Sequence, residues 1–162
     1  MKLAIYPGSF DPFTNGHKEI LGRTCKIFDM VIVAIAADDD KQSLFTLQER
    51  QYLIERATAD LPHVQIDTFK GLVVDYAHQK KAQAIIRGLR TVSDFEYEMQ
   101  MAIFHKQLCP DIETIFLTAS PENSFISAAS VWQIAALGGD VKTFVPEIVA
   151  ATLEQKYKRK RN

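Results

Sequence analysis

The chain has 162 residues, of which 47% are hydrophobic, and it carries 19 basic and 20 acidic side chains. This length and apolar fraction predict a single domain over residues 1–162 with an ordinary hydrophobic core, and they exclude a largely disordered chain. The formal net charge of −1 gives no overall basic field, which argues against a nucleic-acid-binding protein.

The sequence also predicts a cytoplasmic protein. An apolar strand pattern begins at once, which leaves no room for a signal peptide, and no apolar run approaches membrane-spanning length. Cys25 and Cys109 form no C-x-x-C pair, so we interpret them as reduced thiols. Five basic residues lie between 156 and 162, where we expect a solvated, frayed tail rather than a nucleic-acid-binding or membrane-binding arm.

Apolar strand patterns alternate with helical patterns along the whole chain. The strands are predicted at residues 2–6, 30–36, 63–69, 84–86 and 114–118. The helices are predicted at about 17–28, 46–59, 71–81, 93–109 and 127–137, with a last one from Pro146. Capping boxes at Thr46–Glu49 and Ser93–Glu96 mark two of the helix starts. This alternation predicts an α/β fold, a doubly wound Rossmann-like domain with a five-stranded parallel sheet and helices on both faces.

The turn from the first strand into the first helix is the most informative stretch, Tyr6-Pro7-Gly8-Ser9-Phe10-Asp11-Pro12-Phe13-Thr14-Asn15-Gly16-His17. Helix starts attract anions through unpaired N–H groups and a partial positive charge. Gly8 permits a close backbone approach or a positive φ. His17 near the first helical turn is expected to have a lowered pKa and a neutral ring. Neither common glycine-rich phosphate motif is present, so an ordinary loop with a helix-capping histidine is the alternative.

Ligands of open parallel sheets bind beyond the carboxyl ends of the strands. The predicted strand ends are followed in turn by Ser9 and His17, Lys41, Leu72-Val73, Arg87 and Arg90, and residues 123–129. A lysine, two arginines and two helix starts predict a pocket for a polyanion such as a nucleoside triphosphate. The alternative is that both arginines pair with Asp94 and Glu98 on the next helix.

Apart from Asp11, the first loop holds no carboxylate or thiol with a paired base, which argues against covalent catalysis. Phosphoryl-type transfer instead needs mainly alignment and charge neutralisation. An acceptor that is itself a phosphate is already an anionic nucleophile and requires no general base. Asp38-Asp39-Asp40 is interpreted as a solvated loop rather than a metal site, because three adjacent side chains cannot all converge on one ion.

Residues 9–12 followed by Thr14-Asn15-Gly16-His17 resemble the T/H-x-G-H signature of the nucleotidyltransferase superfamily. With Ile86-Arg87-Gly88-Leu89-Arg90 and Asp94-Phe95-Glu96-Tyr97-Glu98, the chain from about residue 3 to 144 resembles the bacterial phosphopantetheine adenylyltransferase family. The resemblance implies transfer of the adenylyl group of ATP to 4′-phosphopantetheine, giving dephospho-coenzyme A and pyrophosphate in coenzyme A biosynthesis. It also implies a homohexamer and Mg²⁺, the ion being held mainly by phosphate oxygens and water.

The resemblance further implies which residues form the site. The catalytic residues would be His17, Lys41 and Arg90. Phosphopantetheine would be bound by Ser9, Lys41, Val73 and Arg87. ATP would be bound by Ser9, Phe10, His17, Gly88, Leu89, Arg90, Glu98, Asn123, Ser124, Phe125, Ile126, Ser127, Ala128 and Ala129. One departure stands out, because the family carries three consecutive serines after Phe-Ile, whereas this chain reads Ser127-Ala128-Ala129-Ser130 and lacks two hydroxyls.

Two rival functions are considered. One is a nucleotidyltransferase with a different phosphate acceptor, such as nicotinamide mononucleotide or glycerol phosphate, against which the Arg87 and 94–98 motifs argue. The other is a nucleotide-binding regulatory module without catalysis, for which Ala128 and Ala129 are the only support.

The helix predicted from residue 94 to about 108 carries more apolar residues than one packed stripe requires. Phe95, Met99, Ala102 and Ile103 would make the face that packs on the sheet, while Met101, Phe104 and Leu108 extend onto another face. We expect this surplus to form the interface of a homo-oligomer. The alternative is that the helix after Pro146 covers it.

Overall fold

The structure, a computed structural model, describes residues 1–37 and 42–161, with side chains as far as residue 158. Strands and helices alternate along it as the hydrophobic pattern predicts. The elements in chain order are β1 (Leu3–Gly8), α1 (Asn15–Thr24), β2 (Met30–Ala36), α2 (Leu47–Ala57), β3 (Val64–Phe69), α3 (Val73–Gln79), β4 (Ala84–Leu89), α4 (Val92–Leu108), β5 (Glu113–Thr118), α5 (Ala128–Ala136) and α6 (Glu147–Arg161).

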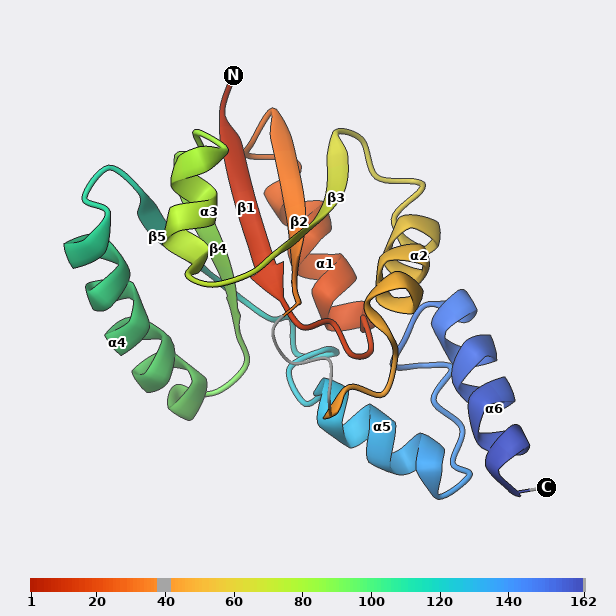
Figure 1. Ribbon diagram of the computed structural model, residues 1–162. Helices are drawn as coiled ribbons and strands as arrows, with labels where there is room; N and C mark the ends of the chain where they lie inside the picture. The colour runs from red at the N-terminus through yellow and green to blue at the C-terminus, as the bar shows by residue number, and fades with distance from the viewer. Residues whose placement is uncertain (38–41, 162) are drawn as a thin grey trace.

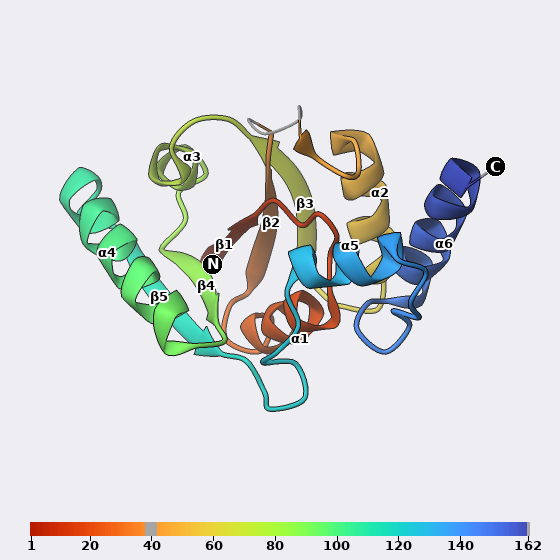
Figure 2. The ribbon, with the colours of Figure 1, turned by 90° about the horizontal axis from the view of Figure 1, so that it is seen from below.

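The five strands form one parallel sheet in the order β3-β2-β1-β4-β5. Helices α1 and α2 cover one face, and α3 and α4 cover the other, as Figures 1 and 2 show. The predicted doubly wound parallel sheet is therefore confirmed. The order in which strands are added to the sheet reverses between β1 and β4, so the crossovers on either side leave for opposite faces. A crevice for ligands is expected at that point, beyond the carboxyl ends of the two strands.

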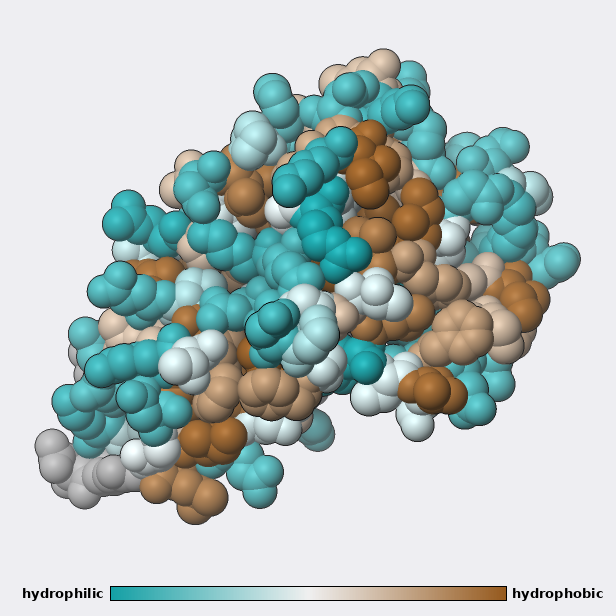
Figure 3. Space-filling view, turned by 180° about the vertical axis from the view of Figure 1, so that it is seen from behind, coloured by the Kyte–Doolittle hydropathy of each residue, from teal (hydrophilic) through white to brown (hydrophobic). Residues whose placement is uncertain are grey.

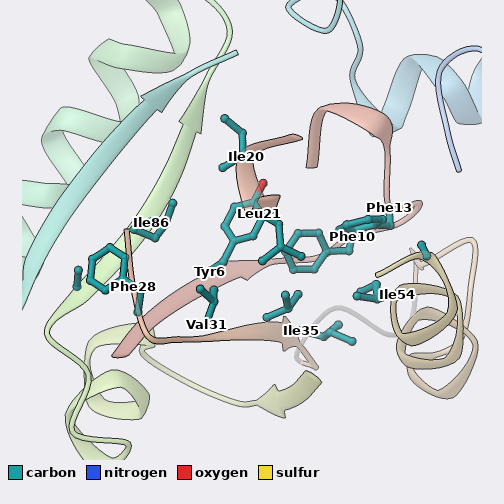
Figure 4. Close-up of a cluster of buried hydrophobic side chains, with 14 residues drawn as sticks. Tyr6, Phe10, Phe13, Ile20, Leu21, Phe28, Val31, Ile35, Ile54 and Ile86 are labelled. Atoms are coloured by element: carbon teal, nitrogen blue, oxygen red, sulfur yellow. The ribbon is translucent and has the colours of Figure 1, made fainter. Parts of the chain in front are cut away.

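A hydrophobic core lies on each face of the sheet. On the α1 side, Leu21 and Ile54 are fully buried against Val31 and Ile35 of β2. Figure 4 shows Phe10 and Phe13 of the β1–α1 loop joining this cluster. On the other face, Val74 and Ala77 of α3 pack against the sheet. Because the core extends into the loop after β1, packing fixes that loop as firmly as it fixes the strands.

Two predicted boundaries near the sheet end are wrong. Strand β4 continues to Leu89, since Arg87 and Gly88 pair with Phe116 and Leu117 of β5. Arg87 and Gly88 are therefore among the last three residues of the strand and do not follow it. Helix α4 begins two residues earlier than predicted, because the Thr91 hydroxyl accepts a hydrogen bond from the Asp94 N–H and serves as the N-cap. The Ser93 capping box is not formed.

The C-terminal segment also differs from the prediction. Helix α6 continues through the basic residues to Arg161, where the sequence predicts a frayed tail. It packs on α2 and α5, with Lys156 Nζ 3.3 Å from a Glu49 carboxylate oxygen. Figure 1 shows α6 and α4 at opposite sides of the molecule, so α6 does not cover α4. Within the described residues, no helix is both long and apolar enough to cross a membrane.

Candidate active site

A cavity of about 390 Å³ opens beyond the carboxyl ends of β1 and β4. Its walls come from the β1–α1 loop, the end of β4, the first turns of α4, and the segment from β5 into α5. Most of the residues predicted to bind substrates line it: Ser9, Phe10, His17, Arg87, Gly88, Arg90, Glu98, Asn123, Ile126, Ser127, Ala128 and Ala129. The predicted convergence at the sheet edge is therefore observed for these residues.

His17 is the third residue of α1 and closes a capping box with Thr14. The Thr14 N–H donates to His17 Nδ1 over 3.0 Å, and the Thr14 hydroxyl accepts from the His17 N–H over 3.3 Å. Since Nδ1 accepts a backbone hydrogen bond, we assign the proton of the neutral ring to Nε2. The loop therefore fixes both the orientation and the tautomer of this histidine.

The surroundings of His17 keep its ring uncharged. The ring centroid lies 5.1 Å from that of Phe10 and 5.6 Å from that of Phe13. Burial, and then the positive charges of Arg90 and Arg87, lower the pKa of His17 to about 4. The sequence predicts this direction but attributes it to the helix dipole, whereas burial is the larger cause. At neutral pH His17 is a neutral hydrogen-bond donor.

The structure contradicts a positive φ at Gly8 and gives a further reason for a glycine at this position. Its φ is not positive, but a Cβ at this position would lie 3.0 Å from the ring of Phe10. Phe10 itself has a φ of 49°, a left-handed conformation that costs a non-glycine residue roughly 1–2 kcal/mol. Burial of its ring, which is only 3% exposed, compensates for that cost. Gly8 thus makes room for the Phe10 ring that packs on His17.

Two side chains tie the β1–α1 loop to the start of α2. The guanidinium of Arg50, a residue only 1% exposed, donates to the Ser9 carbonyl over 2.9 Å and to the Ala36 carbonyl over 3.1 Å. The Asp11 carboxylate accepts from the N–H groups of Leu44 and Phe45 over 2.7 and 2.9 Å. These bonds hold the ends of β1 and β2 together at the mouth of the cavity.

Both arginines that line the cavity have carboxylate partners on α4. Arg87 makes a bidentate pair with Glu98, at 2.7 and 2.6 Å, and donates to the Pro7 carbonyl over 3.1 Å. Burial opposes its charge, but the hydrogen bonds and negative charge of Glu98 outweigh that effect and raise the pKa of Arg87. Arg90 contacts Asp94 at 3.2 Å and donates to the Ile126 carbonyl. The pairing of both arginines with Asp94 and Glu98 is therefore observed, while both side chains still line the cavity.

The start of α5 supplies backbone donors to the cavity. The Ser127 hydroxyl caps the helix by accepting from the Ser130 N–H over 3.0 Å. The first N–H groups of a helix have no partner within it, and here they belong to Ala128 and Ala129, which line the cavity. The missing serine hydroxyls therefore leave the unpaired backbone N–H groups of the helix start in place, the kind of group that binds anions.

Four predicted residues do not line the cavity in the described part of the chain. Val73 packs against the α3 core, and Leu89 ends β4. The Ser124 hydroxyl donates to the Pro121 carbonyl, and the exposed ring of Phe125 contacts Phe144. Lys41 and the triple aspartate fall outside the described residues.

Sequence reasoning missed several residues that shape the site. Thr14 carried a usable signal, because a threonine directly before a helical pattern is a common N-cap. Arg50 carried none, since an arginine on a helix normally points to solvent. Glu19, which binds the segment after β5, also gave no local signal. Contacts between segments that are distant in sequence decide these two roles.

The comparisons with known proteins agree with this geometry. A family model described as cytidylyltransferase-like matches residues 5–134. The phosphopantetheine adenylyltransferase of Clostridium kluyveri is 49% identical over 157 residues, which cover 97% of this chain and 96% of that protein. The one of Syntrophomonas wolfei is 53% identical over 156 residues, covering 96% and 97%.

Solved structures show the same fold at lower identity. A Vibrio parahaemolyticus protein assigned as a nicotinate-nucleotide adenylyltransferase has a TM-score of 0.68 and 20% identity, covering 94% of this chain and 99% of that one. The identity to the two curated relatives, by contrast, is about half and extends over nearly the full length of each chain. The chain therefore belongs to the phosphopantetheine adenylyltransferase family of cytidylyltransferase-like proteins.

Proposed function

We propose that this protein transfers the adenylyl group of ATP to 4′-phosphopantetheine, as a cytoplasmic step of coenzyme A biosynthesis. One observation carries the proposal, namely that a single cavity brings the neutral donor His17 together with Arg87, Arg90 and the start of α5. Membership of the family supplies the identity of the two substrates.

In the proposed reaction, a phosphate oxygen of phosphopantetheine attacks the α-phosphorus of ATP. The bond between that phosphorus and the oxygen bridging to the β-phosphate breaks, and pyrophosphate leaves with the electron pair. The attacking oxygen is already anionic, so no side chain has to remove a proton. His17 Nε2–H would donate to a non-bridging oxygen of the α-phosphate, where negative charge increases in the transition state.

The two arginines would divide the substrates between them. Arg87 and Lys41 would hold the phosphate of phosphopantetheine, while Arg90 and the backbone N–H groups of Ala128 and Ala129 would hold the phosphates of ATP. Arg87 and Arg90 are held by Glu98 and Asp94, so an incoming phosphate has to share or replace those carboxylates. Each guanidinium would then have an anionic partner both before and after its substrate binds.

Mg²⁺ is proposed as the cofactor. Within the described residues no group of three or more His, Cys, Asp or Glu side chains is arranged to hold a metal ion. The carboxylates that line the cavity, Asp94 and Glu98, are already paired with arginines. The donor set therefore fits an ion coordinated by phosphate oxygens and water, whose chemistry would be to neutralise charge on the phosphates.

Pyrophosphate release tests the function. The protein is incubated with ATP and Mg²⁺, and the acceptor is varied among phosphopantetheine, nicotinamide mononucleotide, nicotinate mononucleotide and glycerol phosphate, with a no-acceptor control. We expect steady release with phosphopantetheine alone. Faster release with another acceptor would assign a different nucleotidyltransferase. Binding of ATP without release for any acceptor would indicate the regulatory module.

A homo-oligomer that assembles through α4 is the second part of the proposal. Helix α4 has no buried residue, and Ile103, Phe104 and Leu108 are each about 60% exposed. Figure 3 shows hydrophobic side chains on the side of the molecule where α4 lies. Unpartnered apolar faces of this kind mark interfaces. The homohexamer of the resembled family is the assembly we propose.

The rotation of α4 differs in part from the prediction. Phe95 faces the sheet and packs edge to face on Phe116, and Glu98 faces the cavity. These two contacts turn Ile103 outward and Met101 partly inward, the reverse of what the sequence predicts. Light scattering should therefore show an oligomer that Phe104→Glu disrupts and that Phe125→Glu, at another exposed phenylalanine, leaves intact. A wild-type mass of 18.3 kDa, one chain, would contradict the proposal.

A further inference from the structure

Glu19 gathers four hydrogen bonds that the proposed reaction does not use. It lies on α1 two residues after His17, and its carboxylate accepts from the Ser120 hydroxyl at 2.7 Å and the Ser120 N–H at 3.2 Å. It also accepts from Asn123 Nδ2 at 2.6 Å and from Arg23 at 3.1 Å. Only Arg23 belongs to the same helix, so three of these bonds connect α1 to the segment between β5 and α5.

Arg23 strengthens the same connection. It lies one helical turn after Glu19, and its guanidinium also donates to the carbonyl of Thr118, the last residue of β5, over 2.6 Å. Two side chains of α1 therefore hold Thr118, Ser120 and Asn123, three points within six residues. The segment adds its own turn, in which the Asn123 N–H donates to the Ser120 carbonyl.

This segment leads directly into a wall of the cavity. Ala119, Asn123 and Ile126 line the cavity, and Ser127 caps the helix start proposed to bind ATP. Its intervening residues Pro121 and Glu122 are exposed, so hydrophobic packing does not fix their position. The polar bonds from α1 therefore fix residues 118–123 of this wall, while Ile126 at its far end is packed in the core.

Because His17 and Glu19 belong to one helix, the geometry links the proposed donor to the proposed nucleotide site. We propose that Glu19 is a positioning residue that holds segment 118–127 in register with His17 for binding ATP. The inference rests on the proposed function for the identity of the nucleotide. Glu19 is not among the lining residues of the cavity, so it would act through Ser120 and Asn123.

The carboxylate is suited to this role. Burial opposes its charge, but the bonds from Asn123, Ser120 and Arg23 outweigh that effect and lower the pKa of Glu19. One oxygen faces two groups that can only donate, the Ser120 N–H and the Arg23 guanidinium, while the other faces Asn123 Nδ2 and the Ser120 hydroxyl. Replacing the carboxylate by the isosteric amide of glutamine places an NH₂ donor against other donors.

Calorimetric titration with ATP and with phosphopantetheine, measured separately, tests the inference. Glu19→Gln should weaken ATP binding at least about tenfold, equivalent to ~1.4 kcal/mol, and leave phosphopantetheine binding within about twofold. Glu122→Gln is the matched control, since it removes the same charge from an exposed position in the same segment. It should change neither affinity.

Further variants separate positioning from general stability. Glu19→Asp keeps the charge on a shorter side chain and should recover part of the ATP affinity. Ser120→Ala should weaken ATP less than Glu19→Gln does, and the double variant should lose less than the sum of the two, because both act through one contact. Equal losses for ATP and phosphopantetheine, or an effect of Glu122→Gln as large as that of Glu19→Gln, would overturn the positioning role.

The proposed function can fail independently of this inference. If the wild type releases no pyrophosphate with phosphopantetheine but Glu19→Gln still weakens ATP binding selectively, the acceptor is wrong and the positioning role is supported. If the wild type turns over phosphopantetheine and Glu19→Gln binds ATP normally, the function is supported and the positioning role is rejected.

Discussion

The two long walls of the cavity are built in different ways. On the β1–α1 side, His17 is held by Thr14 and by the rings of Phe10 and Phe13, and the loop itself is tied down by Arg50. On the β4–α4 side, charged pairs provide the order, and α4 contributes no buried residue. The first wall is packed, and the second is held by electrostatics.

This difference matches the two tasks that the proposed reaction sets. A donor that acts in the transition state has to be in place beforehand, because reorganising it during the reaction would raise the barrier. Phosphate-binding charges, by contrast, have to exchange one anionic partner for another as substrates enter and products leave. Carboxylates on a lightly packed helix permit that exchange. Mutations should therefore affect rate on the first wall and affinity on the second.

Removing the donor is the strongest way to test this distinction. His17→Ala should lower kcat by ~10²–10³, as loss of one preorganised donor does, and leave the ATP dissociation constant within about threefold. Single-turnover kinetics and calorimetry measure the two quantities separately. His63→Ala, at an exposed histidine outside the cavity lining, should change neither quantity. Near-normal turnover in the His17 variant would remove it from its assigned role.

A pH titration tests whether the packing of the β1–α1 wall lowers the pKa of the His17 ring as described. The pKa of His17 is about 4 in the fold, whereas an unperturbed histidine has a pKa of 6.5. Between those values the unfolded chain binds a proton that the folded chain does not, so the stability due to neutral His17 is complete above pH 6.5. It is lost as the pH falls through this window to about 4, by about 3 kcal/mol in total.

The comparison variant for this titration is His17→Gln, because glutamine does not titrate and can occupy the same capping-box position. As the pH falls from 7 to 4, the unfolding free energy of the wild type should decrease relative to that of His17→Gln by about 3 kcal/mol. An NMR titration of the His17 ring should show no protonation near pH 6.5. A midpoint at that value would mean that the ring is solvated, and the contrast between the walls would disappear.

The fold was predictable because its determinants are local. Buried strands such as 30–36 are continuous apolar runs, and Thr46–Glu49 forms the capping box that its spacing predicts. The errors occur where tertiary pairing extends or shifts an element. Arg87 and Gly88 are not typical strand residues, but their pairing with β5 extends β4 to include them. Thr91, and not Ser93, is the N-cap of α4, because its hydroxyl accepts from the Asp94 N–H.

The sequence predicted the site best where its residues lie near the carboxyl end of a strand. Ser9, His17 and Arg90 could be placed at the sheet edge from chain order alone. Arg50 and Glu19 could not, since their partners lie 41 and about 100 residues away in sequence. The family resemblance supplied the roles of Val73 and Phe125, yet neither lines the cavity in the described structure. Roles transferred by motif do not replace the geometry.

Mutations of Arg87 and Arg90, on the β4–α4 wall, should change the affinity for substrates. Hydrogen bonds to charged groups contribute ~1.5–3 kcal/mol each, or about ten- to a hundredfold in binding. Arg87→Ala should weaken phosphopantetheine by this amount and ATP less, and Arg90→Ala should do the reverse. Calorimetry with each substrate measures both losses, with Arg56→Ala at an exposed position of α2 as the control. Equal losses of affinity for both substrates in both variants would contradict the assignment of Arg87 to phosphopantetheine and of Arg90 to ATP.

The smallest expected effect lies at the start of α5, which combines features of the two walls. Its donors are preorganised backbone N–H groups, but they serve affinity and not rate. Ala128→Ser with Ala129→Ser adds two hydroxyls at residues that line the cavity. A neutral hydrogen bond contributes about 0.5–1.5 kcal/mol, so one new bond to a phosphate should tighten ATP binding at most about tenfold, with kcat unchanged.

Calorimetry on this double variant therefore asks whether the backbone alone already satisfies the phosphates. Unchanged affinity would mean that the N–H groups of the helix start carry the whole contact, as the geometry of the Ser127 cap allows. The control is Ala136→Ser, at the exposed last residue of the same helix and outside the cavity lining, which should not alter ATP binding. Loss of affinity in the double variant would place these two positions against protein rather than nucleotide, and the wall formed by α5 would then be packed like the one that holds His17.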